Sequence, residues 1–285
     1  MPEIRHTVAP EEAGRQVKSL ALGVMGLSRG LFSSLKFSGG LSLDGMPVRA
    51  DRRVEAGQVL AARWEEKASA VPAPAAADYG LVWEDAYYAV LDKPAPLPTL
   101  SSARQGGPSL ESAVCARLGC QFRPVNRLDK GTSGLLAAAK DRNAQQRLQR
   151  LLHTEDFLRE YLAVCRGAPP CGEGAVDLPI GRGEGVRRAV DPAGRRAVTH
   201  YRVEQTAGEL TLLRLRRETG RTHQIRVHLA ALGCPVLGDY LYGEADPRLP
   251  GRFALHACRL RFLHPFTGEE VALESPLPEA LRALL

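Results

Sequence analysis

The sequence predicts an α+β protein in which a small α/β module precedes a larger domain. Three observations predict this. Residues 1–66 carry two helical patterns and then short apolar runs, residues 67–78 alternate proline and alanine without a core pattern, and residues 79–285 combine strand-like runs with helical patterns. A chain of 285 residues is long enough for two domains. We therefore expect domains at 1–66 and 79–285, joined by a linker at 67–78.

The first module is predicted to hold two helices and a small sheet. Apolar residues recur at helical spacing from Glu12 to Met25. Ser28 can cap a second helix, which would end near the glycine at Gly39. Asp44 and Gly45 stand between short apolar runs, a pattern typical of a hairpin, and a closing strand follows.

The second domain opens with elements that can be placed in order along the chain. Two β-rich runs around an acidic turn predict a hairpin over residues 81–94, and leucine and valine four apart predict a helix over residues 107–118. The apolar run from Leu135 to Ala139 predicts a buried strand. Asn143 can cap the helix that follows.

The C-terminal half continues with the same two patterns. Alternation from Arg159 to Gly167 predicts a strand, and residues 210–215 predict another that turns at glycine and enters a helix near Thr222. Residues 256–269 read as a strand, a turn and the start of a second strand.

Composition and charge narrow the classes of function. The net charge is +6 and arginine dominates the cations, which suits a polyanionic partner. No segment approaches ~18 uninterrupted apolar residues, so no membrane span is expected. The N-terminus has no apolar signal-peptide core, and we expect a cytoplasmic protein. His223 and His228 are five apart and no cysteine pair has zinc spacing, so we expect no metal.

A conspicuous polar stretch precedes the predicted buried strand. Arg127 and Asp129 are two residues apart and would share one face of an extended backbone. Gly131, Ser133 and Gly134 allow the backbone to turn and a ligand to approach. By itself an arginine two residues from an aspartate is common, and it usually forms a solvated surface pair worth little. The stretch is nevertheless a candidate for a carboxylate site flanked by cations.

The stretch resembles the central signature of the RluA-type pseudouridine synthases, H-R-L-D-x-x-T-S-G-L-L, with Asn126 in place of the histidine. Three further stretches resemble family motifs and occur in the family's order. Lys93 lies in the first, Arg159 replaces the usual lysine of the K-x-Y motif, and residues 220–239 match G-R-T-H-Q-I-R-V-H closely, with the following G-x-P-V-x-G-D. The resemblance implies a mixed, largely antiparallel sheet with flanking helices and a central catalytic cleft.

The same resemblance implies an activity and a set of site residues. Members convert uridine to pseudouridine in RNA without a cofactor. Asp129 would be the catalytic nucleophile, Tyr161 would stack on the target base, and Arg226 would hold Asp129 in its ionised form through a bidentate contact. Substrate contacts are implied for Arg127, which would fill the place vacated by the extruded base, and for Asn126, Thr132, Arg221, His223 and Gln224.

The first module resembles a small RNA-binding module named after a ribosomal small-subunit protein, with Ser28-Arg29-Gly30 between its helices and Lys36 in the second. A scaffold without RNA contact is the alternative. For the whole chain, a non-catalytic RNA-binding or ribosome-assembly protein is the second hypothesis, which the Asn126 departure favours. A glycosidase would need a second catalytic carboxylate, and none stands out. Ribosomal and transfer RNA are both open as substrates, and we expect a monomer.

Overall fold

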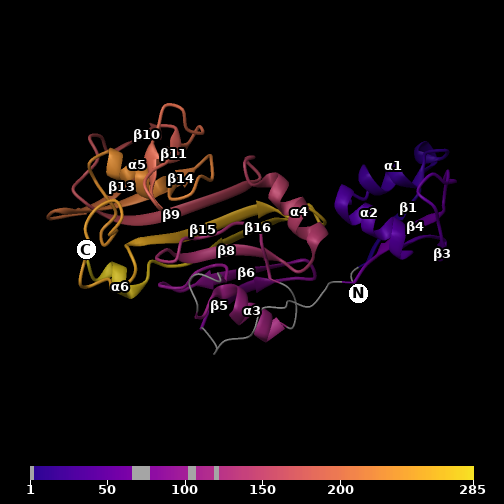
Figure 1. Ribbon diagram of the computed structural model, residues 1–285, viewed down its shortest axis with the longest axis horizontal. Helices are drawn as coiled ribbons and strands as arrows, with labels where there is room; N and C mark the ends of the chain where they lie inside the picture. The colour runs from indigo at the N-terminus through magenta and orange to yellow at the C-terminus, as the bar shows by residue number, and fades with distance from the viewer. Residues whose placement is uncertain (1–2, 66–77, 102–106, 119–121) are drawn as a thin grey trace.

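The computed structural model describes residues 3–65, 78–101, 107–118 and 122–285. Its N-terminal part contains a four-stranded antiparallel sheet in the order β1-β4-β2-β3 (Figure 1). These strands are β1 (Glu3–Thr7), β2 (Leu41–Leu43), β3 (Met46–Pro47) and β4 (Val59–Arg63). The predicted Asp44–Gly45 hairpin joins β2 to β3, with φ angles of 51° and 82°. Except for Asp78, the predicted proline and alanine linker lies outside the described residues.

The helices of this part differ in length from the prediction. The expected helix over residues 12–25 is a 3-10 turn, η1 (Pro10–Glu12), and then a short helix, α1 (Val17–Leu22). Gly14 separates them, because its φ of +80° lies outside helical geometry. The second helix, α2 (Arg29–Ser38), is confirmed: the Ser28 hydroxyl accepts from the Leu31 amide at 2.9 Å, and Gly39 ends the helix in the left-handed conformation.

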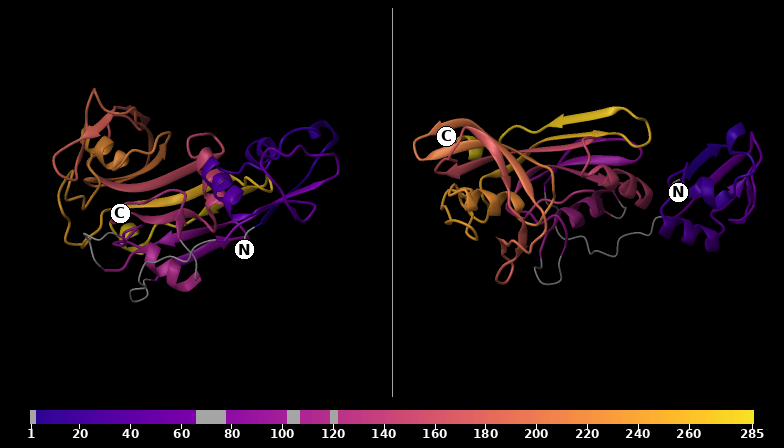
Figure 2. Two further views of the ribbon diagram at one scale, coloured as in Figure 1. Left: turned by 45° about the vertical axis from the view of Figure 1, so that its right-hand side comes forward. Right: turned by 90° about the horizontal axis from the view of Figure 1, so that it is seen from above.

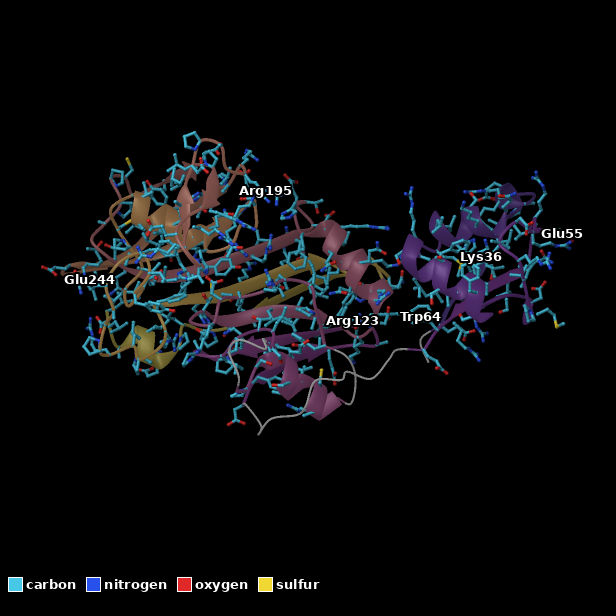
Figure 3. The ribbon with its side chains drawn as sticks, in the orientation of Figure 1. Lys36, Glu55, Trp64, Arg123, Arg195 and Glu244 are labelled. Atoms are coloured by element: carbon cyan, nitrogen blue, oxygen red, sulfur yellow. The ribbon has the colours of Figure 1, made fainter. Side chains whose placement is uncertain are left out.

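The N-terminal elements bury a hydrophobic cluster of their own. It draws on both helices and on the sheet, and its buried members all lie between Val8 and Trp64. Side chains of this part, Lys36 and Trp64 among them, are drawn in Figure 3. No buried residue of this cluster is shared with the clusters of residues 78–285 that the structure describes. A boundary between two units near residue 66 is compatible with this separation.

The larger part is built on a sheet of ten described strands. Its main path runs β10-β13-β14-β9-β15-β8-β6-β5, with β16 beside β15 and β7 beside β8. Every described pairing is antiparallel except that of β8 with β15. The strands are β5 (Gly80–Glu84), β6 (Tyr88–Lys93), β7 (Arg123–Pro124), β8 (Ser133–Ala139), β9 (Phe157–Arg166), β10 (Glu173–Asp177), β13 (Val198–Ala207), β14 (Leu210–Arg217), β15 (Leu255–Leu263) and β16 (Glu270–Glu274).

A two-stranded sheet, β11 (Ile180–Arg182) with β12 (Arg188–Val190), stands apart from the main sheet. In the right-hand view of Figure 2 the yellow β15–β16 hairpin runs along the upper side of the sheet. The mixed, largely antiparallel sheet with helices, expected from the motifs, is therefore confirmed. No helix of the described residues is long and apolar enough to cross a membrane.

Among the described residues, four helices accompany the main sheet: α3 (Leu110–Leu118), α4 (Arg142–Leu151), α5 (Gln224–Ala231) and α6 (Glu279–Arg282). The helix predicted from residue 107 thus begins three residues later. The predicted cap at Asn143 is wrong, because Asp141 caps α4 and accepts from the amides of Asn143 and Ala144 at 2.7 and 2.9 Å. A carboxylate two residues earlier reaches the same unpaired amides with a full negative charge.

Strand β8 is the centre of the packing, because every one of its seven residues is buried. Its alternate side chains enter two hydrophobic clusters, one containing Leu136 with residues of α3 and α5, the other containing Leu135 with residues of α4. Both faces of β8 are therefore covered, as in the interior strands of layered folds. The loop that leads into β8 is therefore anchored at its C-terminal end by a fully buried strand.

Candidate active site

Asp129 lies in the loop that leads from β7 into β8. The loop is fixed from both sides: the Thr132 amide donates to the Asp129 carbonyl at 3.0 Å, and the Thr99 hydroxyl donates to the Leu128 carbonyl at 2.8 Å. Leu128 is buried, whereas the Asp129 side chain keeps 31% of its exposure. The backbone is thus held by the core while the carboxylate remains accessible.

Arg226 reaches Asp129 from the buried helix α5, 97 residues further along the chain. Its Nη1 donates to Asp129 Oδ2 at 3.1 Å. Its Nε and Nη2 donate to the two carboxylate oxygens of Asp239 at 2.6 and 2.7 Å. The expected contact with Asp129 is present, but the expectation that it is bidentate is wrong, because the two-pronged contact goes to Asp239. Asp239 accepts from Nε and Nη2 on one side of the guanidinium, so Nη1 is the nitrogen that reaches Asp129.

The surroundings keep the Arg226 guanidinium charged and in one orientation. The side chain is 3% exposed, and its guanidinium lies over the rings of Phe253 and Tyr242, at 4.2 and 5.0 Å from the ring centres. Burial by itself would lower the pKa of Arg226, but the hydrogen bonds and charges of Asp239 and Asp129 outweigh burial and raise it. Asp239 is fully buried, and its two hydrogen bonds hold the Arg226 cation in place beside the accessible Asp129 carboxylate.

His223 is a second group facing Asp129. It precedes α5 with a φ of +57°, a conformation uncommon for a residue other than glycine. Its Nε2 is 3.9 Å from Asp129 Oδ2, and its Nδ1 is 2.8 Å from the Tyr242 hydroxyl. Burial lowers the pKa of His223, although the Asp129 charge opposes this, and the lowered pKa favours the neutral ring. A neutral imidazole has one donor and one acceptor nitrogen for these two neighbours.

Tyr161 enters the same region through the strand register. Ala257 of β15 pairs with Gly134 on one side and with Tyr161 on the other, so Tyr161 lies two strands, or about 10 Å, from the start of β8. The Tyr161 ring is buried in the cluster that also contains Leu128. Arg217 of β14 donates to the Tyr161 hydroxyl at 2.6 Å and lies over its ring.

Lys93 contacts the backbone of the loop that carries Asp129. It ends β6 and is completely buried. Its ammonium donates to the carbonyls of Pro94 and Leu97 at 2.9 and 2.7 Å, and lies 3.5 Å from that of Lys130. Burial lowers the pKa of Lys93 to about 7, although the nearby Asp129 charge opposes this. The side chain ties the first family-like motif to the residue that follows Asp129.

Gln224 is used within the protein. Its amide nitrogen donates to the Val198 carbonyl and the Thr199 hydroxyl, at 2.8 and 3.0 Å. Its oxygen accepts from the Thr219 hydroxyl and the Arg221 amide, at 2.7 and 3.0 Å. Because the side chain is buried and fully bonded, it fixes the turn before α5.

The other residues with an expected substrate contact fall into two groups. Asn126 and Thr132 are buried, and the Asn126 side-chain oxygen accepts from the Ala137 amide at 2.9 Å. Arg127 is exposed, and Arg221 is half-buried with its Nε donating to the Arg196 carbonyl at 2.9 Å. Among the described residues no group of three or more His, Cys, Asp or Glu side chains could hold a metal ion.

Comparison with known proteins decides the family. The family model described as RNA pseudouridylate synthase matches residues 87–231, a range that includes Asp129, Tyr161 and Arg226. The chain belongs to the RNA pseudouridylate synthase family. Its members isomerise uridine to pseudouridine in RNA, and this chain is such an enzyme.

Relatives extend the match to nearly the whole synthase. The chain is 36% identical to the ribosomal large subunit pseudouridine synthase D of Xanthomonas campestris over 99% of this chain and 92% of that protein. It is 34% identical to the uncharacterized RNA pseudouridine synthase YjbO of Bacillus subtilis over 92% and 96%. The solved structure of human RNA pseudouridylate synthase domain containing 1 is similar with a TM-score of 0.60 and 28% identity, over 72% of this chain and 87% of that chain.

Two residues of this arrangement were missed by sequence reasoning. Asp239 ends the last family-like motif, so its position was marked, but no pattern indicated that it would hold Arg226. Tyr242 has no sequence signal, because its link to His223 depends on a turn that brings it back to the start of α5. Both lie on the segment that follows α5, where the chain turns repeatedly.

A first prediction concerns Lys93. Its pKa of about 7 in the folded synthase lies below the ~10.4 of an unfolded chain, so between these values the unfolded state binds the proton more tightly. The contribution of Lys93 to stability therefore rises with pH from about 7 to 10. Urea unfolding of wild type and Lys93→Met should show the difference moving in favour of wild type by roughly 1 kcal/mol per pH unit. A difference independent of pH would contradict the buried-lysine assignment.

A second prediction concerns Asn126, which replaces the family's histidine. Its side-chain oxygen satisfies the amide of Ala137 inside β8, and its nitrogen has no partner among the described residues. Asn126→Ala should lower the free energy of unfolding by about 1–2 kcal/mol, because the Ala137 amide loses its acceptor. Chemical denaturation measures this, and unchanged stability would show that the amide finds another partner.

Proposed function

We propose that Asp129 is the catalytic nucleophile of this synthase, with Arg226 as the cation that stabilises its charge and Tyr161 as the ring that receives the target base. The observation that carries the proposal is the 3.1 Å contact between Arg226 and Asp129, made by a guanidinium that Asp239 holds rigidly. A preorganised charge of this kind favours an ionised carboxylate without rearrangement during the reaction.

The residue types suit the chemistry of the isomerisation. The bond from the sugar C1′ to N1 of uracil breaks and a bond from C1′ to C5 forms, while C5 loses a proton and N1 gains one. All atoms are retained, so no cofactor is required. The Asp129 carboxylate supplies the nucleophile for the cleavage step, either at the sugar or at the base. His223, whose ring nitrogen lies 3.9 Å from Asp129, is within reach of the same reacting groups.

Reaching the target base requires its extrusion from the RNA stack, at a cost of a few kcal/mol. We propose that exposed Arg127, two residues before Asp129, occupies the vacated place. Arg221 and His223 are proposed substrate contacts, because both remain accessible. Buried Asn126, Thr132 and Gln224 are better suited to supporting the loop and the start of α5 than to touching RNA.

The RNA that we propose as substrate is that of the large ribosomal subunit. Support comes from the relatives named ribosomal large subunit pseudouridine synthase D, which match nearly the whole chain. The N-terminal part, residues 1–66, is proposed as a separate RNA-binding module, and its exposed Lys36 is available for a phosphate (Figure 3). In the larger part, exposed Arg195 is available in the same way. A cytoplasmic location and a monomeric state remain predictions.

A direct experiment tests the substrate. Purified enzyme is incubated separately with transcripts of large-subunit ribosomal RNA and of transfer RNA, and pseudouridine is mapped by carbodiimide labelling and primer extension. We expect new pseudouridines at a few fixed positions of the ribosomal transcript. Conversion confined to the transfer RNA would overturn the substrate proposal and leave the family activity intact.

A further inference from the structure

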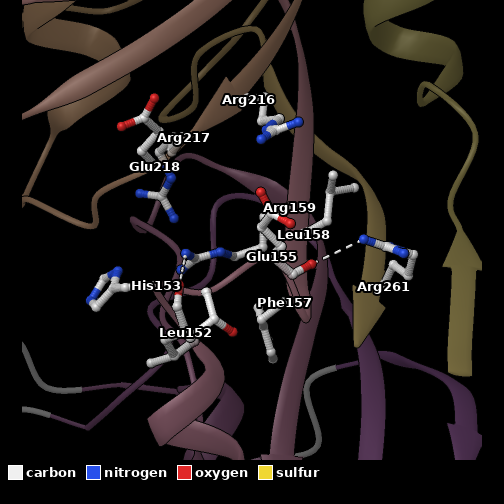
Figure 4. Close-up of a pocket in the computed structure, with 11 residues that line it drawn as sticks. Leu152, His153, Glu155, Phe157, Leu158, Arg159, Arg216, Arg217, Glu218 and Arg261 are labelled. Atoms are coloured by element: carbon white, nitrogen blue, oxygen red, sulfur yellow. Dashed lines mark hydrogen bonds between the residues drawn. The ribbon is translucent and has the colours of Figure 1, made fainter. Parts of the chain in front are cut away.

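A pocket of about 550 Å³ opens beside the start of β9, and Asp129 is not among its lining residues. Figure 4 shows its walls: Arg159 and Phe157 from β9, Arg216 and Arg217 from β14, and His153 from the segment after α4. Arg261 of β15 closes one side. This volume lies within the range of pockets that hold small ligands.

The pocket follows from the strand register. The ladder between β14 and β9 ends at the pair Arg216–Glu160, so Phe157, Leu158 and Arg159 have no partner on β14. The chain of β14 leaves the sheet just beyond, at Arg217, while the segment after α4 forms the opposite wall. The pocket therefore lies where β14 no longer pairs with the first residues of β9.

The charges in this space are unbalanced. Arg159 is 5% exposed, and it has no carboxylate partner among the described residues. Its Nη2 donates to the Leu152 carbonyl at 2.6 Å, and its Nε is buried without a partner. Burial, and next to it the charge of Arg217, lower the pKa of Arg159 to about 10. A buried guanidinium without a counter-ion is costly, and an anionic ligand would offset that cost.

The two glutamates that line the pocket leave its positive charge in excess. Glu218 is bonded to His200 and Arg196, at 2.8 and 3.2 Å, both outside the pocket. Glu155 contacts Arg261 through its main-chain carbonyl, as the dashed line in Figure 4 marks. Four arginines thus face the space against these two carboxylates.

Arg217 connects the pocket to the candidate active site. Its guanidinium lines the pocket and also donates to the Tyr161 hydroxyl at 2.6 Å, with the ring centre 4.8 Å away. One side chain therefore separates the pocket from the ring proposed to receive the target base. A ligand in the pocket would therefore share Arg217 with that ring.

We propose that this pocket binds a backbone phosphate, together with its nucleoside, of the RNA strand next to the target uridine. The inference rests on the proposed role of Tyr161. Arginines in a fork geometry match phosphate oxygens, and the remaining volume accommodates the attached sugar and base beside Leu152 and Leu158. The pocket thereby fixes the register of the strand, so that one particular uridine faces Tyr161.

The first experiment compares Arg216→Gln with the matched control Arg202→Gln. Arg202 of β13 pairs with Arg214 of β14, which is two residues from Arg216. Arg202 therefore lies on the same face of the sheet as Arg216, but it does not line the pocket. RNA binding is measured at several salt concentrations with a stem-loop that the wild-type enzyme converts. We expect Arg216→Gln to raise Kd and KM about tenfold, more than it lowers kcat, and to reduce the salt slope by about 0.7. Arg202→Gln should match wild type.

The second experiment locates the phosphate. Each linkage flanking the target uridine is replaced in turn by a neutral methylphosphonate, and binding is measured with wild type and Arg216→Gln. One linkage should weaken wild-type binding about tenfold and have little further effect on the variant. Penalties that are equal for the two proteins at every linkage would overturn the proposal.

Arg159 gives an independent check. Arg159→Lys keeps the charge and should retain most of the affinity, whereas Arg159→Met should lose it, with folding of both confirmed by thermal melting. If Arg159→Met folds and binds as wild type does, the pocket takes no phosphate. If the wild-type enzyme converts stem-loops of transfer RNA but none of large-subunit ribosomal RNA, the proposed substrate is wrong, and the same binding tests with the converted stem-loop still decide the pocket.

Discussion

Asp129→Asn is expected to lower the rate of pseudouridine formation by at least ~10⁴-fold, because the neutral amide cannot act as the anionic nucleophile. The asparagine oxygen can still accept from Arg226, so the loop and the fold are expected to persist. Single-turnover conversion of a ribosomal transcript measures the rate, and filter binding shows whether RNA is still bound with wild-type affinity.

The matched control for this substitution is Asp177→Asn, an exposed carboxylate at the end of β10. It changes the net charge by the same amount and should leave the rate unchanged. Product formation by Asp129→Asn within tenfold of wild type would remove the central assignment. A variant that neither binds RNA nor melts cooperatively would show instead that Asp129 is needed for the structure.

Asp239→Asn is expected to reduce kcat by about 10²-fold, with a much smaller effect on RNA affinity. Asp239 does not contact Asp129 directly; it holds Arg226 through two hydrogen bonds of 2.6 and 2.7 Å. An amide keeps one acceptor but turns a donor toward the guanidinium, so Arg226 shifts and the contact with Asp129 loosens. Asp239 is thus a positioning residue.

Asp246→Asn is the control for the pair. Asp246 is also buried and holds Arg248 through two side-chain hydrogen bonds of 3.0 and 2.8 Å, and Arg248 lowers the pKa of Asp246 to about 2. Among the described residues Asp246 forms its ion pair with Arg248 and not with Asp129 or Arg226, so its loss should affect stability more than kcat. Equal losses of kcat in Asp239→Asn and Asp246→Asn would indicate a general structural effect. A KM effect larger than the kcat effect would contradict the positioning role.

Local patterns predicted most elements of the fold. The hairpin at Asp44–Gly45, the cap at Ser28 and the buried strand β8 follow from turn chemistry, capping and hydrophobic runs, which act over a few residues. The errors lie at boundaries. Gly14 divides the predicted first helix into a 3-10 turn and a short helix, and Asp141 rather than Asn143 caps α4.

The site residues divide in the same way. Asp129, Tyr161 and Arg226 stand in motifs that the sequence displays, and the contact between Arg226 and Asp129 is the one that the motifs imply. The two hydrogen bonds between Arg226 and Asp239 and the hydrogen bond between His223 and Tyr242 were not predicted. They depend on the direction of side chains after a turn, which residue types and spacing do not fix.

By itself the sequence determined the fold class and the family, and it predicted Asp129 as the reacting carboxylate, because each rests on residues close together in the chain. Only the tertiary structure decided that Asp239 accepts the two-hydrogen-bond contact of Arg226. It also decided that Lys93 is buried next to the Asp129 loop, and that an arginine-lined pocket lies beside Tyr161. The physical reason is that hydrogen bonding and burial depend on distances between segments far apart in sequence, and packing alone sets those distances.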